Sequence, residues 1–163
     1  RQQAHCYSAV TTMEFEPAHF QQMAGLVCYY NSAKFHYLYV THDDELGRHL
    51  RVMSCIPDAV VTDQFSAPIP IAAGRIELRV EVDHERLRFG YRTGSASWQW
   101  VPQQFDASVL SDEATTPGAP NFTGAFVGVA CQDIAGTGQH ADFDWFEYRE
   151  REYVVDPTRE PQG

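Results

Sequence analysis

Residues 75–82, RIELRVEV, alternate strictly between apolar and charged side chains. The apolar positions are Ile76, Leu78, Val80 and Val82, and a charged residue lies between each pair. Successive side chains of a strand point to opposite faces, whereas one face of a helix recurs every three to four residues. The alternation therefore predicts a β-strand with one face in a core and the other in solvent, as in an antiparallel sheet.

Strand signals recur along almost the whole chain, and helix signals are nearly absent. Further strand-like segments, separated by turn residues, occupy 23–30, 35–41, 48–55, 86–92, 97–102, 123–133 and 140–150. Only DASVLSDEA, residues 106–114, could hold a short helical turn. Many short strands without a crossover helix predict an all-β fold, a two-sheet antiparallel β-sandwich or jelly roll. We expect a single β-sandwich domain over residues 1–153 and a polar tail or linker remnant over residues 154–163.

The segment HADFDWFEYRE, residues 140–150, changes phase in the middle of its pattern. Ala141, Phe143 and Trp145 share one face, but beyond Trp145 the apolar phase passes to Phe146 and Tyr148. A one-residue change of phase inside a strand is typical of a β-bulge. We therefore expect a bulged strand whose aromatic rings fill the space between the two sheets.

The charge of the chain excludes one class of partner. There are 22 acidic and 12 basic residues, a formal net charge of −10 at pH 7, so a nucleic-acid partner is not expected. No apolar run approaches the roughly 20 residues of a membrane helix, and no signal peptide is visible, so we expect a cytoplasmic protein without a membrane partner. The chain begins at Arg1 rather than Met, and we expect a processed chain or a piece of a longer one.

Motifs that would hold a metal or cofactor are not recognisable. Cys6, Cys28, Cys55 and Cys131 are far apart, have no CxxC or Cys/His spacing, and lie in apolar surroundings. We expect four reduced thiols that pack as small apolar groups in a reducing compartment, with a disulfide as the alternative. The seven histidines form no HExxH motif. The sequence therefore predicts neither a metal site nor a cofactor.

The sequence gives only weak evidence for catalytic groups. Asp142 and Asp144 share one strand face, about 7 Å apart by strand geometry, but a solvated sheet face accounts for them better than glycosidic catalysis. The acidic run 43–45 reads as a turn, with a calcium site as the alternative. Trp98 and Trp100 share a parity and indicate either sandwich core, which we favour, or a platform for sugar rings. No GxSxG elbow is present, and no set of residues forms an active site by itself.

Four longer blocks resemble a known family. They are FEPAHFQQMAGLVCYYN at 15–31, FDASVLSDE at 105–113, NFTGAFVGVACQD at 121–133 and HADFDWFEYRE at 140–150. In this order they resemble the C-terminal domain of bacterial and fungal β-xylosidases of glycoside hydrolase family 43. The resemblance covers nearly the whole chain and implies a concanavalin A-like β-sandwich.

The resemblance also implies a role. In that family an N-terminal five-bladed propeller carries out inverting hydrolysis of xylosides, so this chain would be its non-catalytic accessory domain. Relatives reach the propeller with one loop of the sandwich and close the substrate pocket with a Phe. By position that residue is Phe122, flanked by Asn121 and Thr123, and it would contact xylo-oligosaccharide. Alternatively, Phe122 begins a core strand.

Two questions about the whole protein stay open at this point. One is whether the domain contributes to the contacts of a homo-oligomer. From a different functional class, the alternative is a free-standing carbohydrate-binding module of the lectin type, which the aromatic content of 13% would suit.

Overall fold

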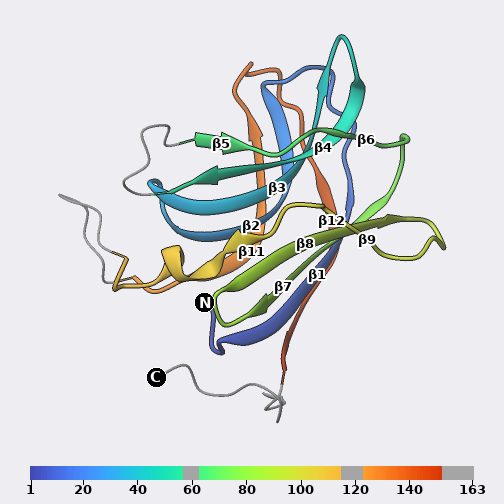
Figure 1. Cartoon of the computed structure of the whole chain (residues 1–163). Helices are drawn as coiled ribbons and strands as arrows, with labels where there is room; N and C mark the ends of the chain where they lie inside the picture. The colour runs from blue at the N-terminus through green and yellow to red at the C-terminus, as the bar shows by residue number, and fades with distance from the viewer. Residues whose placement is uncertain (57–62, 115–122, 152–163) are drawn as a thin grey trace.

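The chain folds into two antiparallel β-sheets packed face to face (Figure 1). The structure is a computed structural model and describes residues 1–56, 63–114 and 123–151. The many strands of the two sheets confirm the predicted all-β sandwich. The described part of the chain holds no helix whose length and hydrophobicity would let it cross a membrane.

The first sheet has the strand order β10-β8-β7-β1-β12, with β9 paired to β8. Its strands are β1 (Cys6–Glu14), β7 (Ile76–Asp83), β8 (Arg86–Thr93), β9 (Gln99–Trp100), β10 (Phe105–Asp106) and β12 (Asp142–Glu150). All of its strand pairs are antiparallel. The alternating segment of the sequence is therefore a central strand, β7, between β1 and β8.

The second sheet has the order β11-β2-β3-β4-β5, with β6 paired to β4. Its strands are β2 (Gln22–Asn31), β3 (Lys34–Asp43), β4 (Gly47–Cys55), β5 (Asp63–Phe65), β6 (Ile69–Pro70) and β11 (Phe126–Asp133). These pairs are antiparallel as well. The short 3-10 helix η1 (Ala107–Leu110) lies within the segment predicted to hold a helical turn.

The core lies between the two inner faces. Leu26, Leu38 and Val40 from the second sheet and Leu78 and Val80 from the first are fully buried in one hydrophobic cluster. Inward residues at every second position supply the cluster because each strand presents one of its two faces to the other sheet. Burial of this apolar area is the main source of the stability of the domain.

The bulge in β12 lies one residue before the predicted place. Thr12 pairs with Trp145 and Met13 with Phe143, which leaves Asp144 as the extra residue on β12. The apolar phase therefore changes at Asp144 rather than after Trp145. The prediction failed because Trp145 continues the alternation of the preceding residues, and the sequence alone does not indicate which residue the bulge displaces.

Only part of the aromatic bulk of β12 enters the core. Phe143 and Tyr148 pack against the hydrophobic cluster, as predicted. Trp145 and Phe146 are each 41% exposed, so the expectation that all these rings lie between the sheets is wrong. β12 is the last strand of its sheet, and an edge strand has fewer neighbours to cover its side chains.

Phe89 and Phe146 provide a matched test of this packing, because Phe89 is fully buried and Phe146 is 41% exposed. Phe89→Ala should lower the free energy of unfolding by about 3–5 kcal/mol through the cavity it leaves. Phe146→Ala should change it by less than about 1 kcal/mol. Urea unfolding of the two variants measures the difference, and equal losses would contradict the packing described.

Candidate functional site

The sequence-predicted lid residues fall on a loop whose two ends are described. Asn121 and Phe122 lie outside the described residues, whereas Thr123 is described and lies just before β11. The Thr123 hydroxyl donates a hydrogen bond of 3.3 Å to the carbonyl oxygen of Tyr30, at the end of β2. The chain on the C-terminal side of the loop is thereby attached to the β2–β3 hairpin.

Lys34 attaches the other end of the loop to the same hairpin. It is the first residue of β3, and its side chain is fully buried. Its Nζ donates to the carbonyl oxygens of Ser111 at 2.8 Å and Ala114 at 2.7 Å. The ammonium also lies 3.8 Å from the centroid of the Tyr30 ring, within the range of a cation–π interaction. We call Tyr30, Lys34, residues 111–114 and Thr123 the loop base.

The loop base is held by charge as well as by hydrogen bonds. Burial lowers the pKa of Lys34, and the carboxylates of Asp112 and Glu113 act in the opposite direction. The Tyr30 hydroxyl donates to the Asp112 carboxylate. A buried ammonium is tolerated only with such partners, so both strands of the hairpin fix the position of residues 111–114.

His36 supports the 3-10 helix that leads into the loop base. It is fully buried, and its Nε2 lies 2.9 Å from the carbonyl oxygen of Asp106 while its Nδ1 lies 2.8 Å from Ser54 Oγ. Burial lowers the pKa of His36, which favours the neutral imidazole. The Asp106 carboxylate accepts a hydrogen bond of 2.8 Å from the backbone N–H of Ser108 and so caps η1.

Sequence reasoning missed both Lys34 and His36 as residues of this site. Lys34 is the one lysine among twelve basic residues, and it follows directly on a turn-prone segment. Such a position normally indicates a solvated charge. The partners that bury it lie about 80 residues further along the chain, so no local pattern could have identified them.

The outer face of the second sheet is apolar and aromatic. Strand alternation and the cross-strand register place Tyr29, Phe35, Tyr37, Tyr39, Met53, Phe65 and Phe126 there, opposite to the core positions. We call this set the aromatic face. Tyr37 and Tyr39 are nearly buried, with ring centroids 5.2 Å apart, whereas Tyr29 and Phe126 are each 40% exposed.

The outer face of the first sheet is charged. Glu81 is buried in ion pairs with Arg79, Arg88 and Arg151, and Arg92 pairs with Glu77 at 2.7 Å. Such a ladder of opposite charges is common on a sheet face that meets water. The two outer faces of this sandwich therefore differ sharply in chemistry.

Trp98 and Trp100 lie on this charged face and outside the core cluster, so the preferred prediction of sandwich core is wrong for both. The Arg88 guanidinium lies 3.9 Å from the centroid of the Trp100 ring, and Arg92 lies 4.7 Å from that of Trp98. The rings thus pack against guanidinium groups. The sequence pattern could not place the two rings correctly, because parity shows that two residues share a face but not whether that face is inside.

Two of the acidic candidates, Asp144 and Asp43, have structural partners. Asp144 forms an ion pair with Arg75, at 2.7 Å, on the exposed edge of the first sheet. The Asp43 carboxylate accepts hydrogen bonds from the backbone N–H groups of Leu46 at 2.6 Å and Glu45 at 2.9 Å, and these lower its pKa. The turn predicted at residues 43–45 is confirmed, with Asp43 as its stabilising side chain.

Comparison with known proteins identifies relatives over nearly the whole chain. A family model described as the β-xylosidase C-terminal concanavalin A-like domain matches residues 1–149. A putative β-xylosidase of Escherichia coli K12 is 42% identical over 91% of this chain, and a β-xylosidase of Bacillus subtilis 168 is 38% identical over 93%. In each case the chain spans 28% of the length of the relative.

A solved structure agrees with this assignment. The xylan β-1,4-xylosidase of Bacillus halodurans C-125 superposes with a TM-score of 0.84 and 35% identity, over 92% of this chain and 28% of that protein. The chain therefore belongs to the concanavalin A-like C-terminal domains of the β-xylosidases of glycoside hydrolase family 43.

Proposed function

We propose that this chain is the accessory sandwich domain of a β-xylosidase that acts on xylan-derived sugars, and that its aromatic face packs against the catalytic domain. The observation that carries the proposal is the contrast between the charged outer face of the first sheet and the aromatic outer face of the second. An antiparallel sheet that meets only water has a polar outer face. A contiguous apolar patch of this kind is typical of an interaction surface.

The exposed rings of the aromatic face lie towards both edges of the second sheet. Phe126 on β11 and Phe65 on β5 are 40% and 48% exposed, and every residue of β11 is at least partly exposed. An edge strand of this length is normally covered or charged in a protein that stands alone. Nearly three-quarters of each relative lies outside the matched domain, so the catalytic domain is the occupant that these relatives suggest.

We further propose that Phe122 closes the substrate pocket of that catalytic domain. The support is the loop base, which ties residues 111–114 and Thr123 to one rigid hairpin through Lys34 and Tyr30. A side chain on a loop can exclude water from a sugar only if the ends of the loop are fixed. The ring at position 122 would then contact xylo-oligosaccharide from outside the catalytic domain.

The proposed docking of the aromatic face against the catalytic domain can be tested in the full-length enzyme. Phe126→Asp would bury an unpaired carboxylate at a cost of at least about 2 kcal/mol. It should lower the thermal midpoint of the sandwich domain by about 4–8 °C for a domain of this size.

Trp145→Asp is the matched control, because Trp145 is equally exposed but lies on the first sheet, opposite Thr12. It should shift the midpoint by less than about 2 °C, within the small effect of a surface substitution. In the 163-residue chain alone both variants should behave alike. Equal shifts for the two variants in the full-length enzyme would remove the docking role of the aromatic face.

Phe122→Ala in the full-length enzyme should lower kcat/KM for xylobiose by about fivefold to tenfold, mainly through KM, since an aromatic contact is worth about 1 kcal/mol beyond its buried area. Lys34→Met should have a similar effect by releasing the loop base. The double variant should lose little more of kcat/KM than either single variant, because both changes remove the same interaction. Kinetic constants equal to those of the unmodified enzyme for Phe122→Ala would exclude the lid role.

The alternative, a free-standing carbohydrate-binding module, has a direct test. The Trp98 and Trp100 rings already contact guanidinium groups, so they are poorly placed as a sugar platform. We expect the 163-residue chain to show neither heat of binding with xylo-oligosaccharides nor hydrolysis of an aryl xyloside above a buffer blank. Saturable binding that Trp98→Ala abolishes would instead establish the carbohydrate-binding module.

A further inference from the structure

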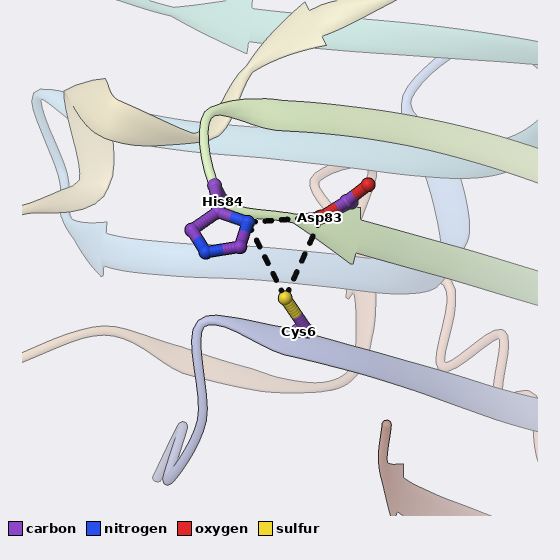
Figure 2. A group of neighbouring side chains, drawn as sticks. All are labelled: Cys6, Asp83 and His84. Atoms are coloured by element: carbon purple, nitrogen blue, oxygen red, sulfur yellow. Dashed lines mark hydrogen bonds and ion pairs between the residues drawn. The ribbon is translucent and has the colours of Figure 1, made fainter. Parts of the chain in front are cut away.

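Cys6, Asp83 and His84 meet at one corner of the first sheet (Figure 2). Cys6 is the first residue of β1 and pairs directly with Asp83, the last residue of β7. His84 follows in the turn between β7 and β8, and its ring points back towards the Cys6 sulfur (Figure 2). The three side chains thus come from two neighbouring strand ends.

The donor atoms of the three residues form a small triangle. Cys6 Sγ lies 3.4 Å from His84 Nδ1 and 3.5 Å from Asp83 Oδ1, and Nδ1 lies 2.9 Å from Oδ1. Tetrahedral zinc, with bonds of about 2.0–2.3 Å, separates adjacent donors by about 3.3–3.6 Å. The two sulfur distances agree with that range. The nitrogen–oxygen distance would have to lengthen slightly. The side chains of His84 and Asp83 are 50% and 68% exposed, so they have room to move apart.

The backbone around the triangle is fixed on each side. The N–H of His84 donates to the carbonyl oxygen of His5 at 2.9 Å, and the N–H of Arg151 donates to that of Cys6 at 2.9 Å. His84 is the one non-glycine residue with positive φ, 55°, in the described part of the chain. A left-handed conformation at a histidine is uncommon and is often found at functional sites. It directs the imidazole over the Cys6–Asp83 pair.

We propose that Cys6, Asp83 and His84 bind a divalent metal ion of the Zn²⁺ class through a thiolate, a carboxylate oxygen and an imidazole nitrogen. Sulfur and nitrogen donors suit zinc and related transition metals, whereas Ca²⁺ and Mg²⁺ prefer oxygen donors throughout. Three protein ligands leave a fourth position for water. The site is distinct from the loop base and the aromatic face, and it does not depend on the proposed function.

When the ion binds, it replaces the proton of the Cys6 thiol. Burial and the hydrogen bond to Asp83 raise the pKa of the Cys6 thiol, so the metal-free protein carries S–H. The S–H bond breaks as the sulfur–metal bond forms, and the proton passes to water. Arg151, which also faces the cluster, is paired with Glu81 at 3.3 Å, which limits its repulsion of the ion.

The experiment measures metal binding to the 163-residue chain directly. Competition with a chromophoric chelator should give saturable Zn²⁺ binding with one equivalent at this site, which excess Ca²⁺ does not displace. Co²⁺ in place of Zn²⁺ should give the near-ultraviolet charge-transfer band of a thiolate ligand. Zn²⁺ should also raise the unfolding midpoint, because an ion that binds only the folded state stabilises it.

Two variants test the ligands, and a third serves as the control. Cys6→Ser and His84→Asn should each weaken Zn²⁺ binding by at least about 100-fold, since loss of outer partners alone costs about 10- to 100-fold. Asn tolerates positive φ, so His84→Asn removes the imidazole but keeps the turn. Cys131→Ser is the matched control, because Cys131 is an exposed thiol on β11, and this variant should bind Zn²⁺ and Co²⁺ like the unmodified chain.

The same measurements can overturn the proposal. It fails if the unmodified chain binds Zn²⁺ no more tightly than Cys6→Ser, or if the charge-transfer band persists in Cys6→Ser and disappears in Cys131→Ser. Displacement of Zn²⁺ by Ca²⁺ would exclude the metal class. Unfolding midpoints of the metal-free variants, measured in parallel, establish that each is folded.

Discussion

The contact between the two inner sheet faces is the interaction on which the rest of this structure depends. Leu38 and Val40 on β3 meet Leu78 and Val80 on β7 in one cluster that excludes water. Because strand side chains alternate, an apolar inner face leaves the composition of each outer face unconstrained by the core. The charged and the aromatic outer faces are therefore separate features, and each needs its own physical reason.

The polar groups buried at one end of the sandwich show how this core positions a loop. Lys34 and His36 lie on the inner side of β3, where an apolar residue would be less costly to bury. Three of their hydrogen bonds end on backbone carbonyls of residues 106, 111 and 114, which belong to no strand of the second sheet, and a fourth joins His36 to Ser54 on β4. A methionine or leucine could fill the same space but could not determine where that segment lies. The polar pair thus determines where that segment lies rather than adding to the stability of the domain.

Local periodicity and turn residues were sufficient to predict the sandwich, its long strands other than β1 and the helical turn before the loop, because these depend on neighbours in sequence. The position of the bulge was missed, since Trp145 fits either phase. Trp98 and Trp100 were assigned to the core because a shared face does not reveal which face is inside. Lys34 and the cluster of Cys6, Asp83 and His84 depend on partners 77 to 80 residues away, and no spacing rule connects them.

His84 and the loop base line one hollow at the surface. It is lined by residues 1–5, by His84 and Glu85 of the β7–β8 turn, and by Ser111, Asp112 and Glu113 of the loop base. A divalent cation beside His84 would place positive charge at the rim of a hollow that is lined by the acidic residues Glu85, Asp112 and Glu113 and by the basic residue Arg1. Charges that line one hollow influence each other over several ångströms even in the presence of salt. Occupancy of the metal site would therefore change the charge of the hollow that Asp112 also lines, the same residue whose carboxylate accepts the hydrogen bond of Tyr30 and helps to fix the loop base.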